Sequence, residues 1–272
     1  MIISIYIGNR ELIIDERFTS LLEDLRKGGC QLQILEPGEV PSEKAEMLLS
    51  AGGDGTFLSS SVLAVERGLP MLGVNLGRLG FLSENRPEDV AKCILSGDYT
   101  IENRTMLKAE VTTGNPDIDL WPYALNEMAV RRNGAAMLAV DVVIDGVCLP
   151  TYWADGLVVS TSSGSTAYSL SVGGPIVLPD SKVLIVSPIA PHNLNMRPLV
   201  VPDSSEISLT MHSRDGRFEF SADNRTCVVS EDVAVRISVA QFSLKRVQFN
   251  SSNFINALTD KLFWGEDVRN IK

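Results

Sequence analysis

The stretch Ser50-Ala51-Gly52-Gly53-Asp54-Gly55-Thr56 follows an apolar run, 47–49, and precedes a helix-like segment, 57–66. Glycine adopts positive φ values and lets a ligand approach the backbone closely. Exposed N–H groups ahead of a helix N-terminus favour anions such as phosphate. Asp54 would then lie beside the anion, where its carboxylate can hold a metal or accept a proton. A strand-to-helix turn without a ligand is the alternative explanation of the same stretch.

Size and charge limit the possible ligands. The chain has 272 residues, of which 44% are hydrophobic and 21% charged. These values are ordinary for a globular protein of one large or two ordinary domains. The formal net charge of −10 argues against a nucleic-acid or anionic-membrane surface as partner. A polyanionic small molecule would therefore need local help from loop N–H groups, arginines or a metal.

Cysteine spacing and the start of the chain indicate the compartment. Cys30, Cys93, Cys148 and Cys227 are too widely spaced for zinc-type pairs. The apolar segment 1–7 is short and lacks the basic residues that begin a signal peptide. No apolar stretch approaches the roughly 18 residues of a transmembrane helix. We expect a reduced, soluble, cytoplasmic protein.

Strands and helices alternate in the first part of the chain. Short β-branched and apolar runs predict four strands: 2–7, 30–35, 45–50 and 70–75. Apolar spacing and end signals predict three helices: 15–27, 57–66 and the segment between Pro87 and Gly97. This alternation predicts a Rossmann-like α/β domain over 1–97 with a mostly parallel sheet. Ligands of such sheets bind at the carboxyl ends of the strands, where the glycine-rich turn lies.

The pattern changes near residue 98. Short β-rich runs separated by turn residues follow: 137–144, 156–161, 182–187, 207–212, 217–221, 233–239 and 243–249. They predict an antiparallel β-sandwich domain over 98–250, in which 165–171 is the clearest helical segment. Asn253 is placed to cap a closing helix, and we expect 251–272 to pack back on the N-terminal domain.

Several common catalytic motifs are missing. The chain contains no Gly-Lys pair, which excludes a P-loop. A dinucleotide fingerprint that begins at Gly53 fails at Leu58. His192 and His212, the two histidines, cannot build a multi-histidine metal site. His212 lies in a strand pattern, whereas His192 is compatible with either a site or a loop.

Polar residues gather in the β-rich part. Asn126 and Glu127 interrupt an apolar run, where they could bind a ribose or lie on the solvent face of an edge strand. Almost every residue of 160–169 is Ser, Thr, Gly or Tyr, a composition that suits hydrogen bonds to sugars and phosphates. Asp155 precedes a predicted strand as an acceptor for an amide or hydroxyl. The segment 223–225 is typical of a surface turn.

Taken together, these stretches resemble the NAD kinase family. The matching segments follow the order of the family: 52–56, 73–81, 126–127, 155–156, 164–171, 173–175 and 188–198. Together with Asn224, which also matches, these segments run from about residue 50 to 225, roughly two thirds of the chain. The first motif is shared with diacylglycerol and sphingosine-type lipid kinases, whereas 164–171 is far more specific to NAD kinases.

The resemblance implies phosphoryl transfer from ATP, another nucleoside triphosphate or polyphosphate to the adenosine-ribose 2′-hydroxyl of NAD. It implies Mg²⁺ bound with the nucleotide phosphates, and a homodimer or homotetramer. Asp54 would be the general base.

The resemblance also implies a set of substrate-binding residues. Gly52, Gly53, Gly55 and Thr56 would form the loop at NAD and the phosphates. Asn126 and Glu127 would bind the ribose or phosphate region, and Asp155 the nicotinamide side of a dinucleotide. Thr166, Ala167, Tyr168 and Ser171 would line the adenine and ribose pocket. Phe81 would pack near adenine, with Ala190 and Asn224 at the rim.

Two other functions stay open at this stage. A lipid kinase could share the first motif, but it would need an apolar acceptor channel, and the net charge of −10 opposes attraction to an anionic membrane. A non-catalytic NAD(P) sensor could retain the pocket, although it would have no need of Asp54.

Overall fold

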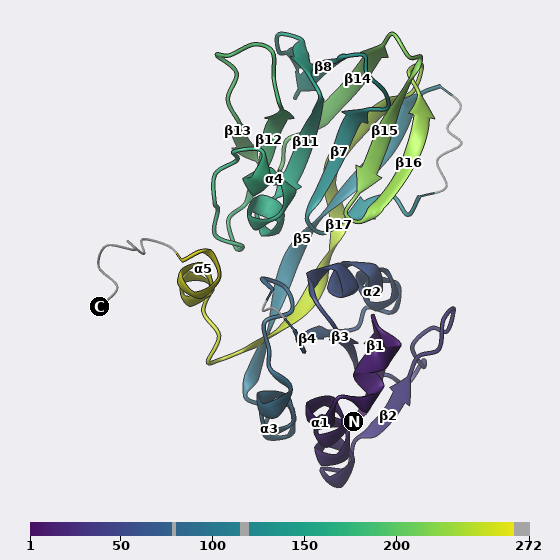
Figure 1. Cartoon of the computed structure of the whole chain (residues 1–272), viewed down its shortest axis with the longest axis vertical. Helices are drawn as coiled ribbons and strands as arrows, with labels where there is room; N and C mark the ends of the chain where they lie inside the picture. The colour runs from purple at the N-terminus through teal and green to yellow at the C-terminus, as the bar shows by residue number, and fades with distance from the viewer. Residues whose placement is uncertain (78–79, 115–119, 264–272) are drawn as a thin grey trace. The chain divides into compact units, whose positions relative to one another are not determined.

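The computed structural model describes residues 1–77, 80–114 and 120–263 (Figure 1). The chain forms two compact units. The first contains Met1–Asn103 and the chain from Leu244 onward, and the second contains Arg104–Ser243. Two long strands, β5 (Tyr99–Thr113) and β17 (Ala234–Phe249), carry the chain from one unit to the other.

The first unit is built on a parallel sheet. Its strands lie in the order β2, β1, β3, β4, β17, and each neighbouring pair is parallel. The bounds are β1 (Ile2–Ile7), β2 (Gln31–Ile34), β3 (Met47–Ala51) and β4 (Met71–Val74). The predicted parallel α/β arrangement is confirmed.

Helices follow these strands as the sequence predicts. They are α1 (Glu16–Lys27), α2 (Asp54–Arg67) and α3 (Pro87–Ser96), with a short 3₁₀ turn η1 (Arg10–Ile14). Asp15 caps α1 by accepting the N–H groups of Arg17 and Phe18, which satisfies donors that a helix start leaves unpaired. The apolar face of α1 packs into the core of this unit, because Phe18, Leu21, Leu22 and Leu25 are all buried.

The second unit contains an antiparallel sheet in the order β13, β12, β11, β7, β15, β16. Its bounds are β7 (Glu127–Arg132), β11 (Gly156–Thr161), β12 (Val183–Ile189), β13 (Leu199–Pro202), β15 (Arg217–Ala222) and β16 (Arg225–Ser230). The remaining strands are β6 (Tyr123–Ala124), β8 (Leu138–Ile144), β9 (Val147–Cys148), β10 (Tyr152–Ala154) and β14 (Ile207–Ser213).

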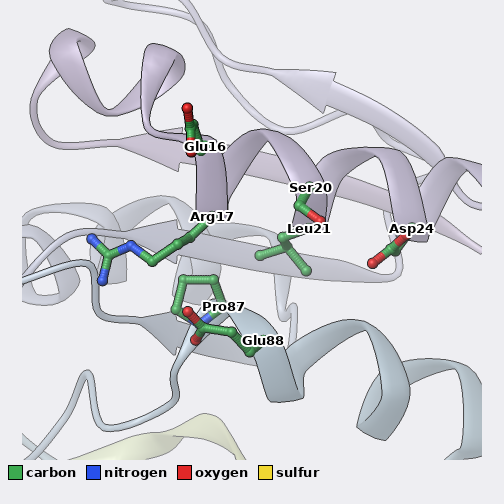
Figure 2. Close-up of a pocket in the computed structure, with 7 residues that line it drawn as sticks. All are labelled: Glu16, Arg17, Ser20, Leu21, Asp24, Pro87 and Glu88. Carbon is green, nitrogen blue, oxygen red and sulfur yellow. The ribbon is translucent and has the colours of Figure 1, made fainter.

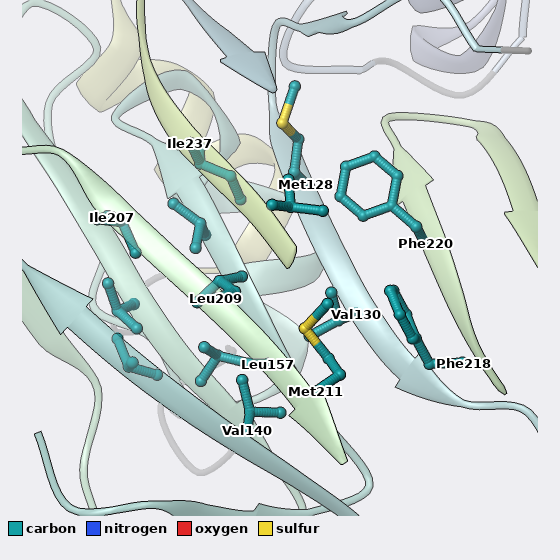
Figure 3. Packing of buried hydrophobic residues seen from close by; sticks show 14 of the residues in the cluster. Met128, Val130, Val140, Leu157, Ile207, Leu209, Met211, Phe218, Phe220 and Ile237 are labelled. Atoms are coloured by element: carbon teal, nitrogen blue, oxygen red, sulfur yellow. The ribbon is translucent and has the colours of Figure 1, made fainter. Parts of the chain in front are cut away.

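One apolar core joins the strands of this unit. Figure 3 shows Val130, Leu157 and Phe218 from the six-stranded sheet packed with Leu209 and Ile237 from β14 and β17. Side chains that alternate inward from two layers of strands are the pattern of a β-sandwich. The predicted β-rich, antiparallel part of the fold is therefore confirmed.

Two local predictions differ from the structure. The expected strands 233–239 and 243–249 form the single strand β17, because Ala240-Gln241-Phe242-Ser243 contains no glycine, proline or asparagine to break it. The expected helix 165–171 is a 3₁₀ turn, η2 (Ser163–Thr166), followed by one α-helical turn, α4 (Tyr168–Ser171). The pair Gly173-Gly174 stops any longer helix.

A closing helix, α5 (Phe254–Leu262), belongs to the first unit. The Asn253 side chain caps it by accepting the Ile255 N–H at 2.8 Å. The Phe254 ring packs against Phe81, with ring centroids 6.0 Å apart. Residues from 264 onward lie outside the described part of the chain. Within the described residues, no helix is long and apolar enough to cross a membrane.

Candidate active site

The glycine-rich turn between β3 and α2 is tight on one side and open on the other. Gly52 has φ +149°, and a Cβ there would lie 2.4 Å from the Thr56 Oγ1 atom. A Cβ at Gly8 would lie 2.2 Å from the same atom, so Thr56 fills the space between the two glycines. At Gly53 and Gly55 a Cβ would meet no described atom within 4 Å. A ligand can therefore approach the backbone at these two residues.

Asp54 is the first residue of α2, and its carboxylate is held by a loop that follows β4. The Oδ2 atom accepts the Phe81 N–H at 2.8 Å. The Oδ1 atom accepts the N–H groups of Leu82 and Ser83 at 3.0 and 2.8 Å. A carboxylate at a helix N-terminus also interacts favourably with the helix dipole. The side chain is oriented, and Oδ2 keeps a lone pair for a further partner.

The loop 75–83 fits the turn around Asp54. A Cβ at Gly80 would lie 1.9 Å from Asp54 Oδ1, and one at Gly73 would lie 2.8 Å from the Leu82 carbonyl oxygen. The Asn75 amide donates to the Ser83 carbonyl at 3.0 Å and accepts the Gly77 N–H at 2.7 Å. The motifs 52–56 and 73–81 therefore support each other, although Arg78 and Leu79 lie outside the described residues.

Two basic side chains, which the sequence did not indicate, bind the backbone carbonyls of this loop. The Lys261 ammonium of α5 donates to the Gly80 carbonyl and lies 4.5 Å from the centroid of the Phe81 ring. Burial lowers the pKa of Lys261, while Glu84 and Asp54 oppose that shift. Arg246 is buried, donates to the Leu82 carbonyl at 3.5 Å and pairs with Glu84 at 2.6 Å.

A shallow groove of about 280 Å³ lies between α1 and α3 (Figure 2). Its lining comes from both helices: Glu16, Arg17, Ser20, Leu21, Asp24, Pro87 and Glu88. Arg17 at its end donates to the Leu76 carbonyl at 2.8 Å. None of the predicted site residues lines this groove, so we assign it no role in the reaction.

In the second unit, Asn126 and Glu127 lie beside the hydroxyl-rich segment. Glu127 begins β7 and is paired in register with Ser160 of β11. The Thr161 N–H donates to the Asn126 carbonyl at 2.9 Å, and the Thr161 hydroxyl donates to the Leu125 carbonyl at 2.7 Å. A Cβ at Gly164 would lie 2.2 Å from the Asn126 carbonyl oxygen. Only glycine fits there, which explains the close approach of the turn after β11.

Most hydroxyls of 160–169 serve the fold. Ser160, Thr161, Ser162, Ser163, Ser165 and Ser169 are buried. Ser162 donates to the Pro179 carbonyl at 2.9 Å, and Ser165 to the Val177 carbonyl at 3.1 Å. The expectation that this whole segment binds a ligand is therefore too broad. The half-buried Thr166, Ala167 and Tyr168 and the exposed Ser171 remain predicted binding residues.

Glu127 has a buried carboxyl group, one oxygen of which lacks a described hydrogen-bond partner. The Tyr168 N–H donates to its carboxylate. Its Oε2 atom and the Asn126 Oδ1 atom have no hydrogen-bond partner among the described residues. Burial raises the pKa of Glu127 to about 8, and the charge of Asp223 adds to the shift. Buried polar atoms are nearly always paired, so these two oxygens indicate a place for a ligand.

Asp223 corrects the prediction of a surface turn at 223–225. This residue connects β15 to β16, but its side chain is 0% exposed. Its carboxylate accepts the N–H groups of Leu125, Asn126 and Glu127 at 2.8, 2.8 and 3.2 Å. The neighbouring Asn224 is exposed, as a rim residue would be. Local sequence gives no sign of this burial, because the partners of Asp223 lie far away in the chain.

Asp155 and Ala190 lie at the other end of β11. Gly156 is paired with Arg131 and with Ile189, whereas Ser160 at the far end is paired with Glu127. At roughly 3.3 Å per residue, these two groups are separated by about 13 Å of strand. The structure thus does not bring Asp155 to Glu127.

The residues at the Asp155 end of β11 differ in their contacts and exposure. The Asp155 Oδ1 atom accepts from Arg132 Nε at 2.8 Å, and Ala190 is exposed with φ 45°. His192 is exposed too, and its N–H donates to the Trp153 carbonyl at 2.8 Å. Its imidazole is not assigned to a site.

Comparison with known proteins gives consistent matches. The family model described as the ATP-NAD kinase N-terminal domain matches residues 37–96, and the ATP-NAD kinase C-terminal domain matches 125–249. A Flavobacterium psychrophilum NAD kinase is 38% identical over 267 residues, 97% of this chain and 91% of the relative. A Bacteroides fragilis NAD kinase is 41% identical over 229 residues, 83% of this chain and 78% of the relative.

Solved structures show the same fold. Yeast NADH kinase complexed with NADH superimposes with a TM-score of 0.83 at 23% identity, covering 100% of this chain and 90% of that one. An Archaeoglobus fulgidus NAD kinase in complex with ATP gives a TM-score of 0.76 at 26% identity, covering 97% of this chain and 99% of that one. The matching domains, the relatives of nearly full length and the shared fold agree: this chain belongs to the NAD kinase family.

Proposed function

We propose that this chain is an NAD kinase that transfers the terminal phosphoryl group of ATP to the adenosine-ribose 2′-hydroxyl of NAD. Family membership supports this activity. The observation that carries the mechanism is the oriented Asp54 carboxylate, beside glycines where a ligand can approach the backbone. Phosphoryl transfer depends mainly on such positioning and on neutralising phosphate charge.

In the proposed step, Asp54 acts as the general base. Its Oδ2 atom takes the proton of the 2′-hydroxyl while the ribose oxygen attacks the γ-phosphorus. The bond from that phosphorus to the β–γ bridging oxygen breaks, and ADP leaves. Because a carboxylate is a weak base, its contribution comes from orientation, which the three N–H groups of 81–83 provide.

We assign the substrate contacts by unit. In the first unit, the backbone of Gly52, Gly53, Gly55 and Thr56 would hold phosphate oxygens, and Phe81 would lie near adenine. In the second unit, the unpaired oxygens of Asn126 and Glu127 would bind the ribose or phosphate region.

The remaining contacts of the second unit divide between the two ends of β11. Thr166, Ala167, Tyr168 and Ser171 would contact adenine and ribose beside Glu127, with Asn224 at the rim. Asp155 and Ala190 would contact another part of a dinucleotide.

Mg²⁺ would be bound chiefly by the nucleotide. Among residues 1–77, 80–114 and 120–263, no three His, Cys, Asp or Glu side chains gather to hold a metal ion. Mg²⁺ commonly binds through substrate phosphates and only one or two carboxylates, so this donor set fits. Bound there, the ion would neutralise phosphate charge. Homodimer or homotetramer formation and a cytoplasmic location stay predictions.

A coupled assay tests the function. The chain is mixed with NAD, ATP and Mg²⁺, and an NADP-specific dehydrogenase reports the product. We expect NADP formation that depends on all three. Phosphorylation of diacylglycerol instead would support a lipid kinase, and NAD binding without turnover would support a sensor. Replacing ATP by other triphosphates or polyphosphate, and NAD by NADH, then defines donor and acceptor range.

A further inference from the structure

The turn after β15 carries a buried carboxylate that the proposed reaction does not use. Asp223 accepts three N–H groups, from Leu125, Asn126 and Glu127. Its own N–H donates to the Glu127 carbonyl at 2.9 Å. Both the main chain and the side chain of this one residue therefore hold the segment that begins β7.

The burial of Asp223 distinguishes this turn from an exposed hairpin turn. The backbone of Asp223 has φ 52°, a region that aspartate and asparagine adopt more readily than most residues and that two-residue hairpin loops use. Its carboxylate is fully buried, and burial of such a group is unfavourable unless it is well paired. The residues that it holds, Asn126 and Glu127, each present an oxygen without a described partner. The buried Asp223 thus supports the two residues whose side-chain oxygens lack a described hydrogen-bond partner.

We propose that Asp223 is the positioning residue of this binding site. It fixes Asn126 and Glu127, and its negative charge adds to the burial that disfavours an ionised Glu127, so that the Glu127 carboxyl donates a hydrogen bond to a ligand oxygen. The proposal rests on the proposed function only for the identity of that ligand, NAD. A protonated carboxyl supplies one O–H donor, which suits a ribose or phosphate oxygen.

The charges around the pair agree with one proton on Glu127. Arg225 lies 3.8 Å from Asp223 and partly balances its charge. On β7, Arg131 is paired with Glu219 of β15, and β11 contributes the uncharged Ser160 opposite Glu127. From α4, Tyr168 contributes its N–H. Burial raises the pKa of Asp223 too, but its three N–H donors and Arg225 oppose that shift. Among the described residues no cation is paired with Glu127, so the proton of the pair is placed on Glu127.

The first test is an infrared titration of the ligand-free protein. The band of a protonated carboxyl that disappears in Glu127→Gln is followed against pH. We expect its midpoint near pH 8 in the unmodified protein, because burial and Asp223 raise the pKa of Glu127 to about 8. In Asp223→Asn the repelling charge is gone, and the midpoint falls by about one pH unit or more.

The same titration includes a control variant and has two results that would overturn the proposal. Asp141 of the same unit also has a hydrogen-bonded carboxylate, with Thr151 and His212 as partners, and Asp141→Asn should leave the midpoint unchanged. A Glu127 that is ionised at pH 6 in the unmodified protein overturns the proposal, even if Asp223→Asn does not fold. An unchanged midpoint in folded Asp223→Asn does so too.

The second test separates positioning from a merely structural role. In Asp223→Asn we expect KM for NAD to rise about tenfold while kcat stays within about threefold. The pH dependence of kcat/KM should shift toward lower pH, and this shift should be absent when Glu127→Gln is also present. A lower Tm with unchanged KM and pH profile would reduce Asp223 to a turn residue. If no NADP forms at all, the proposed function fails while the infrared result still stands.

Discussion

Asp54 and Asp223 use the same device in the two units, since each carboxylate accepts the N–H groups of three consecutive residues. Asp54 holds 81–83 and Asp223 holds 125–127. They differ in exposure, because Asp54 is half-buried next to glycines with open space around them, whereas the Asp223 side chain is fully buried. Asp54 can therefore act on a substrate directly, and Asp223 can act only through its neighbours.

Basic side chains bind backbone carbonyls of both regions. Lys261 and Arg246 donate to the carbonyls of Gly80 and Leu82. Arg225 donates to the carbonyls of Trp121 and Tyr123, just before the segment that Asp223 holds. In each unit an aspartate fixes a short segment through its N–H groups, and a basic side chain binds carbonyls in that segment or just before it.

The largest effect is expected when the half-buried Asp54 carboxylate is altered. In Asp54→Asn the amide oxygen can still accept the N–H groups of Leu82 and Ser83, but the side chain cannot take a proton. We expect kcat for NADP formation to fall by roughly 10²–10⁴-fold. Asp15→Asn is the matched control, because Asp15 is an N-cap carboxylate in the same unit. If Asp54→Asn retains the kcat of the control, Asp54 has no part in the chemistry.

A smaller loss is expected when the loop is moved and Asp54 is kept. In Gly80→Ala the new Cβ would lie 1.9 Å from Asp54 Oδ1, so the loop must shift and the three N–H bonds weaken. We expect kcat to fall about 10–100-fold, with faster hydrogen exchange at 81–83. Gly77→Ala is the control, since its Cβ would meet Asn75 Oδ1 at an ordinary 3.9 Å. Equal rates in the two variants would show that the loop does not orient Asp54.

The buried region is better probed by stability than by turnover. The pKa of Glu127 is raised from 4.5 to about 8, so folding binds a proton between these values, and stability falls as pH rises through this range. Glu127→Gln removes this dependence. At pH 8 we expect the variant to be more stable by roughly 4 kcal/mol, or on the order of 10 °C in Tm. The test is to measure the Tm of the unmodified protein and of Glu127→Gln at pH 5 and at pH 8. If the Tm of both proteins changes equally between the two pH values, Glu127 is not protonated in the folded protein.

The smallest effect is expected from the cation behind the first loop. Lys261→Met keeps an unbranched stem over the Phe81 ring and loses the donor to the Gly80 carbonyl. We expect kcat to fall about threefold. Lys245→Met is the control, because Lys245 is an exposed lysine of the same unit that donates to the Gly68 carbonyl. A rate for Lys261→Met equal to that of the control would mean that the Lys261 ammonium is not needed to hold the loop.

Local patterns were enough to predict the elements and part of the site. The apolar spacing in α1 and the glycine-rich turn 52–56 have short-range signals, whereas the contact of Asn126 with the segment after β11 spans about 35 residues and has none. Asp223 could not be predicted as a buried anchor, because Asp-Asn-Arg between two strands is typical of an exposed turn and its partners are 96–98 residues away. Lys261 and Arg246 likewise contact residues 181 and 164 positions earlier.

Titration calorimetry with NAD tests the contrast between the two aspartates most directly. The account predicts that Asp54→Asn binds NAD with nearly the affinity of the unmodified protein, because the change affects the proton acceptor and leaves the second unit intact. It predicts that Asp223→Asn binds NAD about tenfold more weakly, because Asn126 and Glu127 lose their support. Normal binding by Asp223→Asn together with lost binding by Asp54→Asn would contradict it.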